Sequence, residues 1–238
     1  MKLVICLGAV LGALLFAQAC SGSDTTPADS LDATKDKGEN VSKLAAMNTP
    51  IFWAEGHPGR LDQESWKVQV TGACEAPKTF TWKEIQEMPQ SEVTSRLTSV
   101  TRWSVKGNWK GVPLSAILDA VEMKPSCKYV RFWSVGGIYD TSIPVDIALK
   151  EKSLLAHSFD GEFLDEDYGG PVRAFIPYLW GYKSAKSVIK IELMEYYVPG
   201  FWEKRGYTDS GEVEAGPCRD INAGGEIKQI KGPGEVEF

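Results

Sequence analysis

Apolar and polar residues alternate in several short runs of this chain, a pattern typical of strands with one buried face. Residues 65–72 show it most plainly, and the apolar residues of that run are Trp66, Val68 and Val70. Further runs rich in apolar, β-branched and aromatic residues are 129–135, 171–177 and 186–197. The dipeptide Asp160-Gly161 predicts a tight hairpin between strands.

Helical patterns are fewer and shorter than the strand patterns. Thr81 and Glu84 stand in the register of a capping box, and Pro89 ends the short helix that follows them. A second short helix is expected within residues 111–123, where Pro113 suits the first turn. Because strands outnumber helices and do not alternate with them regularly, the sequence predicts an α+β fold with a mixed or antiparallel sheet.

The first residues divide the chain into regions. Residues 1–19 have the lysine, apolar run and small residues of a signal peptide, and we expect cleavage before Cys20 and attachment of lipid to it. The alternative is a soluble exported protein in which Cys20 is lost or unmodified. Residues 20–49 are polar and predict a flexible tether. Residues 50–238 are enough for one domain, and the Gly- and Pro-rich residues 214–238 suggest loop.

Charge and cysteine content restrict the function classes. The formal net charge is −6 and lysines are scattered among acids, which argues against nucleic acid as a partner. Cys74, Cys127 and Cys218 allow one disulfide, but their spacing does not select the pair. His57 and His157 lie far apart, and nothing in the spacing of Cys and His supports a zinc site.

Four segments carry more polar groups than turns require: 96–109, 136–149, 168–188 and 199–207. In the first, Ser99 falls on the same face as the apolar residues of its predicted strand. In the third, Arg173 precedes an apolar strand, and a buried guanidinium needs either a structural partner or a ligand. Lys183, Ser184 and Lys186 follow a glycine turn and suit a phosphate or another anion.

Four blocks of the sequence carry a resemblance to a known family. They read "TSVTRWSVKGNWKGVPLSAIL", "IYDTSIPVDIAL", "GGPVRAFIPYLWGYKSAKSVIKIEL" and "GFWEKRGY". In this order they resemble the sulfite-oxidase-type molybdopterin-binding domain, from about Phe52 to about Tyr207. The resemblance implies a compact α+β fold with mixed β-structure and short helices. It also implies a molybdenum-molybdopterin cofactor and oxygen-atom transfer to or from a small oxyanion or sulfoxide.

The resemblance also assigns site residues. Lys183, Ser184 and Lys186 would grip the cofactor phosphate. The other cofactor-binding residues would be His57, Thr101, Arg102, Thr141, Ser142 and Arg173. The residues closest to the chemistry would be Ser99, Arg102 and Tyr139. The redox partner would be a cytochrome or a membrane quinone system, reached from a lipid anchor at the cell envelope.

Three features depart from the family pattern. Ser99 stands where the family has its metal-ligating cysteine, so a metal ligand there would be an alkoxide in place of a thiolate. Tyr168 replaces a histidine, and no twin arginine precedes the apolar run of the signal peptide. Two interpretations follow: a lipid-anchored molybdenum oxidoreductase, or a metal-free descendant that acts as a binding or interaction module on the envelope.

Overall fold

A computed structural model describes residues 41–238 of the chain. The predicted signal peptide, the lipidated Cys20 and most of the predicted tether lie outside these residues. Within them, no helix is long and apolar enough to span a membrane. The last residues of the predicted tether do form structure: helix α1 (Lys43–Ala46) buries Leu44, and the Tyr168 hydroxyl donates a 2.9 Å hydrogen bond to the Thr49 carbonyl oxygen.

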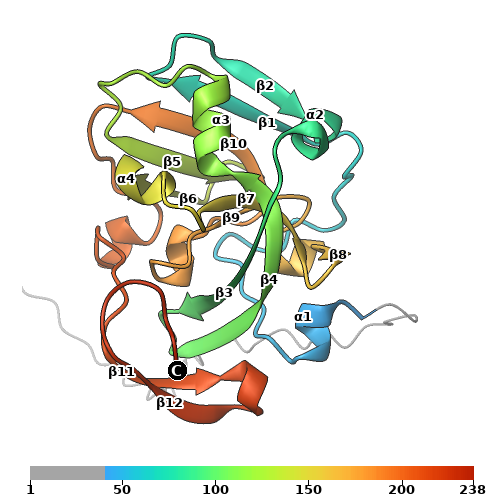
Figure 1. The fold of residues 1–238 in the computed structure, drawn as a ribbon, viewed down its shortest axis with the longest axis vertical. Coiled ribbons are helices and arrows are strands. Elements are labelled where there is room, and N and C mark those ends of the chain that lie inside the picture. Colours follow the sequence, from blue (N-terminus) through green and yellow to red (C-terminus); the bar gives the residue numbers. More distant parts are fainter. Residues whose placement is uncertain (1–40) are drawn as a thin grey trace, which may run out of the picture. The chain divides into compact units, whose positions relative to one another are not determined.

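One sheet has five strands, in the order β2-β1-β10-β5-β6 (Figure 1). Its strands are β1 (Lys67–Gly72), β2 (Lys78–Thr81), β5 (Tyr129–Ser134), β6 (Asp140–Pro144) and β10 (Val188–Met194). Strands β1 and β10 are parallel and the other neighbours antiparallel. The sheet is therefore mixed, as the sequence predicted.

The second sheet has seven strands and follows the path β12-β11-β4-β7-β8, with β3 paired to β4 and β9 to β7. Its strands are β3 (Ser91–Ser99), β4 (Trp103–Pro113), β7 (Leu154–Phe159), β8 (Glu162–Phe163), β9 (Arg173–Phe175), β11 (Gly216–Asp220) and β12 (Glu226–Ile230). Figure 1 shows β11 and β12 beside the end of the long β3–β4 hairpin. Except for the parallel β11–β4 pair, these strands are antiparallel.

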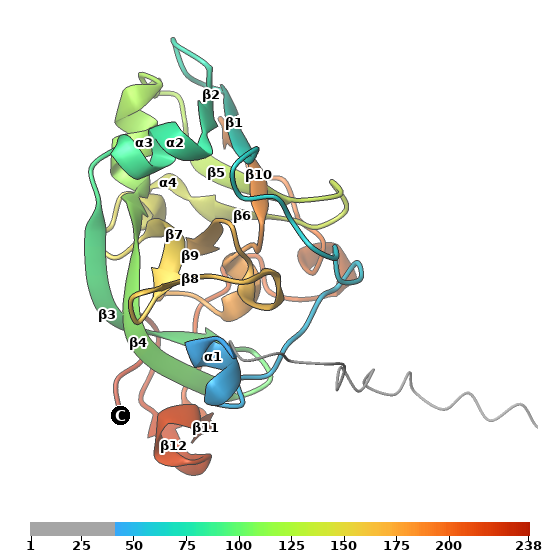
Figure 2. The ribbon, with the colours of Figure 1, turned by 90° about the vertical axis from the view of Figure 1, so that its right-hand side faces the viewer.

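The helices are short, as expected. They are α1, α2 (Trp82–Glu87), α3 (Leu114–Ala120), α4 (Val145–Ala148) and the 3₁₀ turns η1 (Glu166–Tyr168), η2 (Gly181–Lys183), η3 (Glu203–Arg205) and η4 (Ile221–Ala223). Figure 2 shows α2 and α3 on the same side of the first sheet. The predicted capping box of α2 is confirmed: Thr81 Oγ1 accepts from the Glu84 N–H at 3.2 Å, and Glu84 Oε2 accepts from the Thr81 N–H at 2.8 Å.

The predicted tight hairpin is confirmed between β7 and β8. Asp160 and Gly161 both have positive φ, +46° and +84°, as a two-residue turn of the right twist requires. The β3–β4 hairpin instead closes through the loop of Val100, Thr101 and Arg102. Arg102 has φ +63° and its N–H donates to the Ser99 carbonyl oxygen at 2.9 Å. This left-handed residue lets a three-residue loop connect the two strands.

Two apolar clusters form most of the core. The larger one lies along the first sheet and includes Val70, Ile117 and Phe132, which are at most 1% exposed. In the smaller one, the Trp109 ring stacks on Phe175 at 4.4 Å between centroids and meets Phe159 edge-on at 4.8 Å. Such aromatic pairs stabilise the fold beyond the burial of their area, and here they join β4, β7 and β9 of the second sheet.

The carboxy-terminal residues correct the expectation of loop. Residues 214–238 contain β11 and β12, and β11 pairs in parallel with β4. Arg96 on β3 holds Asp220 through two hydrogen bonds of 2.8 and 3.1 Å, both side chains being buried. Glycine and proline content indicated turns correctly but carried no information about this long-range pair.

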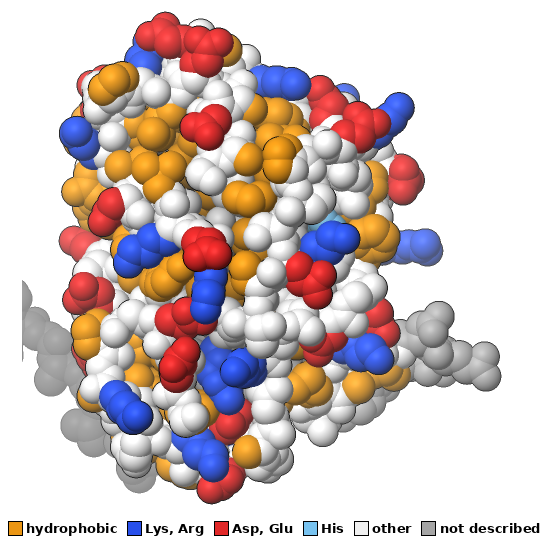
Figure 3. Space-filling view, viewed as in Figure 1, with side chains coloured by type: hydrophobic (Ala, Val, Ile, Leu, Met, Phe, Trp, Pro, Cys, Tyr) orange, Lys and Arg blue, Asp and Glu red, His pale blue; other side chains and the backbone are white. Residues whose placement is uncertain are grey.

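The charged side chains on the surface are scattered, as the sequence indicated. On the face in Figure 3, lysine and arginine side chains are interspersed with aspartate and glutamate, and apolar side chains lie between them.

Candidate cofactor pocket

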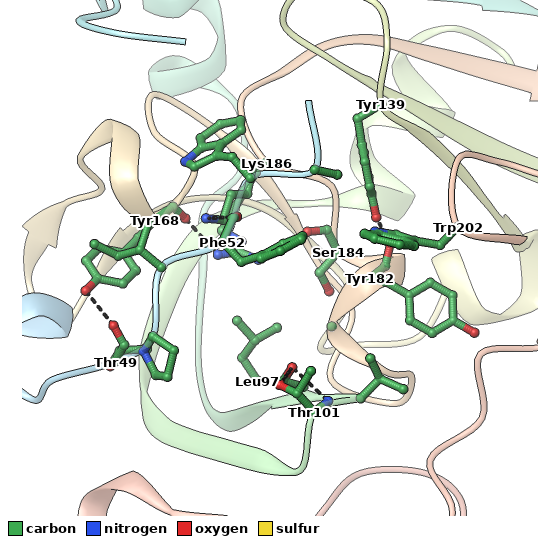
Figure 4. A pocket seen from close by; sticks show the side chains of 18 of the residues that line it. Thr49, Phe52, Leu97, Thr101, Tyr139, Tyr168, Tyr182, Ser184, Lys186 and Trp202 are labelled. Atoms are coloured by element: carbon green, nitrogen blue, oxygen red, sulfur yellow. Dashed lines mark hydrogen bonds between the residues drawn. The ribbon is translucent and has the colours of Figure 1, made fainter. Parts of the chain in front are cut away.

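Four segments that are distant in sequence enclose a pocket of about 440 Å³. They are residues 49–55, the tip of the β3–β4 hairpin (97–103), the 168–186 region and residues 202–207; Leu44, Ser134 and Tyr139 complete the lining. Figure 4 shows side chains from these segments converging on one space. The lining is rich in aromatic rings, among them Phe52, Trp103, Tyr139, Trp202 and Tyr207. A concave, largely apolar space with a few polar groups is typical of a small-molecule site.

Arg173 begins β9 and is only 3% exposed, yet it lines the pocket. Its guanidinium donates to the carbonyl oxygens of Tyr168 at 2.7 Å and Ser184 at 3.1 Å. No carboxylate in residues 41–238 forms an ion pair with it. Burial lowers the pKa of Arg173 to about 10, so its charge costs free energy unless an anion approaches.

Lys186 provides a second cation in the same pocket. Its ammonium donates to the carbonyl oxygens of Phe52 at 2.9 Å and Asp167 at 2.6 Å, and lies 4.7 Å from the centre of the Trp53 ring. Burial, and then the charge of Arg173, lower the pKa of Lys186 to about 7. The two cations therefore disfavour each other's charge, and an anion between them would relieve both.

Glu55 is the one carboxylate among the residues that line the pocket. Its Oε1 atom is buried without a hydrogen-bond partner, and burial raises the pKa of the carboxyl. Three other polar atoms in the lining are also buried without a hydrogen-bond partner among the described residues. They are Thr49 Oγ1, Trp53 Nε1 and Ser134 Oγ. Buried polar groups are normally paired, so this concentration of unpaired groups points to a ligand with several hydrogen-bonding positions.

Ser99 lines the pocket at the hairpin tip, with Leu97 and Thr101. Its hydroxyl is 2.8 Å from Thr101 Oγ1 and accepts from the Thr101 N–H at 3.2 Å. Arg102, predicted beside these residues, points elsewhere. Its guanidinium donates to the Glu214 carbonyl oxygen at 2.9 Å and lies over the Trp180 ring, outside the lining of the pocket.

Lys183 does not line the pocket either. It is fully buried, and its ammonium donates to the carbonyl oxygens of Ser142 at 3.0 Å and Asp209 at 2.7 Å and forms an ion pair with Glu203. Thr141 donates to the same carboxylate at 2.8 Å. These contacts join β6 to η2 and η3 behind the pocket wall, so the ammonium of Lys183 is already satisfied within the protein.

The remaining predicted residues are divided between the pocket and its surroundings. Ser184 and Tyr139 line the pocket: Ser184 Oγ accepts from the Ile176 N–H at 3.0 Å, and the Tyr139 hydroxyl donates to the Tyr182 carbonyl oxygen at 2.5 Å (Figure 4). Ser142 donates to the Val198 carbonyl oxygen at 2.8 Å, outside it. His57 lies outside too, with Nε2 3.1 Å from an Asp167 oxygen.

Protein ligands for a metal are sparse in this region. Cys74, Cys127 and Cys218 are free and buried, and none lines the pocket. His157 is also elsewhere, hydrogen-bonded to Gln90 at 2.8 Å, and burial lowers its pKa to about 4. Across residues 41–238 no three His, Cys, Asp or Glu side chains gather as a metal cluster would require.

Glu55, Trp53 and Thr49 are pocket residues that our sequence analysis did not identify. Their segment resembled the family pattern poorly, and the polar atoms of its side chains looked like those of any surface loop. Residues 49–55 all line the pocket, so no alternation of apolar and polar residues marked these side chains in the sequence.

Comparison with known proteins gives a family match over more than half of the chain. Residues 54–202 match the family model described as the oxidoreductase molybdopterin binding domain. The chain is 32% identical over 164 residues to the uncharacterized oxidoreductase YuiH of Bacillus subtilis (strain 168), a match that covers 68% of this chain and 82% of that protein.

Two further relatives are longer proteins. The putative protein-methionine-sulfoxide reductase subunit YedZ1 of Azospira oryzae is 31% identical over 66% of this chain and 59% of its own length. The protein-methionine-sulfoxide reductase catalytic subunit MsrP of Ralstonia nicotianae is 31% identical over 61% of this chain and 49% of its own. The chain thus covers about half or somewhat more of these two proteins.

A solved structure supports the fold. The sulfane dehydrogenase SoxCD from Paracoccus pantotrophus superimposes with a TM-score of 0.56 at 19% identity, over 73% of this chain and 46% of that one. The family match spans more than half of the chain and includes most of the pocket. The chain belongs to the oxidoreductase molybdopterin binding domain family, which the order of its sequence blocks had predicted.

Proposed function

We propose that the pocket holds a molybdenum-molybdopterin cofactor and that the protein transfers an oxygen atom to or from a small oxyanion or sulfoxide. Membership of the family supports the cofactor. Two relatives named as protein-methionine-sulfoxide reductases support the sulfoxide as substrate. When bound, the cofactor would supply the two-electron chemistry of oxygen-atom transfer.

The observation that carries this proposal is the pair of cations in the pocket. Arg173 and Lys186 both line it, and within residues 41–238 neither forms an ion pair with a carboxylate; burial lowers the pKa of both. A buried charge without a partner is costly, so a site of this kind is stabilised by an anion. The phosphate of molybdopterin is such an anion, and Ser184 lies beside them as a further hydrogen-bonding group.

The other pocket residues suit the rest of the cofactor. A pterin ring carries several hydrogen-bonding atoms, and Trp53, Glu55, Thr49 and Ser134 each offer a buried polar atom without a partner. The volume of about 440 Å³ is in the range of small-molecule sites. Tyr139, whose hydroxyl donates to the Tyr182 carbonyl oxygen, would form part of the wall that encloses the cofactor.

Ser99 is the pocket residue that does not fit the family's metal chemistry, because it stands where the family has a metal-ligating cysteine. The pocket offers no thiolate, and the Ser99 hydroxyl already has Thr101 as its hydrogen-bond partner. This observation favours the second candidate function, a metal-free binding module whose anion pocket serves another ligand. In the oxidoreductase, Ser99 would have to bind as an alkoxide or leave the protein ligand position open.

We place the protein at the cell envelope, held by lipid on Cys20 and extended from the membrane by the tether. Residues 1–19 and the small residues before Cys20 support this location. From there, a cytochrome or a membrane quinone system would exchange electrons with the cofactor.

The test is to purify the protein from the envelope of its own host and to measure molybdenum and pterin per chain. About one of each per chain is the expected result. If both are absent while other molybdenum enzymes of the same cells are loaded, the oxidoreductase proposal fails and the binding module replaces it.

A further inference from the structure

Two of the unpartnered polar atoms in the pocket come from neighbouring positions in one segment. Trp53 Nε1 is a donor without an acceptor, and Glu55 Oε1 is an acceptor without a donor. Both residues line the pocket, as does Ala54 between them, and the chain bends at Ala54 and Glu55. Glu55 Oε1 and Trp53 Nε1 thus offer one buried acceptor and one buried donor to whatever occupies the pocket.

These two residues stand at the Lys186 end of the pocket. The Lys186 ammonium lies over the Trp53 ring, and its charge acts on the Glu55 carboxyl. Figure 4 shows Lys186 and Tyr139 on the side of the pocket away from Thr101, which neighbours Ser99. Trp53, which contacts Lys186, therefore lies toward the side of the pocket away from the hairpin tip, and Glu55 follows it two residues along the chain.

The pattern of the two side chains matches one edge of a pterin. On that edge an amino group and a ring N–H point outward side by side, and a carbonyl oxygen follows. A carboxylate accepts two parallel N–H bonds in the geometry it uses with a guanidinium, and such charge-assisted bonds are the strong ones. An indole N–H is a donor only, and it suits the adjacent carbonyl oxygen.

From this match we infer that Glu55, together with Trp53, reads the amino–N–H–carbonyl edge of a pterin ring. This inference rests on the proposed function because it takes the pocket to hold molybdopterin. It adds that the ring is recognised by side chains of residues 53–55, while Arg173 and Lys186 bind the anionic group. The raised pKa of Glu55 agrees with a carboxyl that lacks its donors in the free protein, and bound N–H groups would lower it.

The inference predicts a preference for pterin over a close analogue, which binding measurements can test without any enzyme assay. Lumazine is a pterin analogue in which a carbonyl replaces the amino group, so it would turn an oxygen toward the Glu55 carboxylate. The full chain, produced in cells that cannot make molybdopterin, should bind pterin about ten- to a hundredfold more tightly than lumazine. Fluorescence titration of either ring measures this.

Glu55→Gln is the test variant, because an amide offers one donor and one acceptor and can pair with lumazine. We expect the preference for pterin to disappear in Glu55→Gln and to persist in the control Glu92→Gln, which changes an exposed carboxyl on β3. Inorganic phosphate should bind both variants as it binds the wild type. If Glu55→Gln also loses phosphate binding, the residue holds the shape of the pocket and the inference is overturned.

Metal content separates this inference from the proposed function. If the wild type carries molybdenum and pterin while Glu55→Gln keeps the wild-type selectivity, only the inference is overturned. If the wild type carries neither in its host but shows a preference for pterin that Glu55→Gln abolishes, the inference stands and the oxidoreductase does not. If the wild type shows no preference between the two rings, the inference is wrong whatever the metal content.

Discussion

Replacing Lys186 with methionine removes a charge that the folded protein holds at a cost. The ammonium lies among groups that act on it in opposite directions. Burial and Arg173 lower its pKa, whereas Asp167, Asp165 and Glu55 raise it, and the sum is a pKa of about 7. Methionine keeps the length and apolar body of the side chain, but it leaves the Phe52 and Asp167 carbonyl oxygens without their donor.

The size of the effect on stability follows from the difference in the pKa of Lys186 between the folded and unfolded states. A lysine whose pKa falls from 10.5 to about 7 on folding binds fewer protons in the folded state between those pH values. Stability therefore rises with pH across that range, by about 2 kcal/mol between pH 7 and pH 9. Below pH 7 both states are protonated, and the full cost of the buried charge, about 5 kcal/mol at most, is present.

Urea unfolding of the cofactor-free full chain at pH 7, 8 and 9 measures this dependence. The wild type should gain stability with pH relative to Lys186→Met, in which the gain from this group is absent. Lys106→Met is the matched control, because Lys106 is exposed on β4 and forms no ion pair within the described residues. Equal pH dependence in the wild type and Lys186→Met would refute the reasoning about the buried ammonium.

An anion changes the same balance. Phosphate bound between Arg173 and Lys186 would keep the ammonium protonated, so binding takes up a proton above pH 7. The affinity for phosphate should then fall up to about tenfold per pH unit above pH 7, and calorimetry in buffers of different ionisation enthalpy would detect the proton.

Four further predictions test other parts of the molecule. Thr81→Ala removes the capping box of α2 and should cost about 1 kcal/mol in urea unfolding; an unchanged midpoint would mean that tertiary contacts alone hold the helix. Lys183→Met leaves the Glu203 carboxylate buried and unpaired and should cost about 3 to 5 kcal/mol, and the double variant with Glu203→Leu should recover much of it; no recovery would show that the pair does not act as a unit. In a protein loaded with cofactor, Ser99→Cys should add a thiolate-to-molybdenum absorption band, and an unaltered spectrum would place residue 99 away from the metal. Cys20→Ser should release the protein from membranes, which fractionation would show, and unaltered membrane association would contradict the lipid anchor.

The sequence predicted the features that depend on neighbours along the chain. The capping box at Thr81, the hairpin at Asp160-Gly161 and the alternation that places Leu97 and Ser99 toward one space are all local patterns. The order of the sequence blocks added the family, and with it the fold.

What the sequence did not reveal depends on contacts between distant residues. Lys183 and Lys186 look alike in "KSAK", but Lys183 pairs with Glu203 behind the pocket wall, whereas Lys186 lines the pocket beside Arg173. Arg102 was expected in the pocket, yet it is turned to Glu214 by a left-handed backbone that no residue type in the loop announces. A polar side chain in a sequence does not indicate whether its partner is another part of the protein or a ligand.

The origin of the pocket walls has a consequence for how the protein is made. Residues 49–55, the hairpin tip and residues 202–207 must meet before the space exists, and closing such long loops is slow in folding because chain entropy is lost before the contacts form. The growing chain therefore has no pocket until the segment with Trp202 and Tyr207 has been synthesised and has docked. Any partner that inserts a cofactor must therefore act after residues 202–207 have been synthesised and have folded against the rest of the pocket.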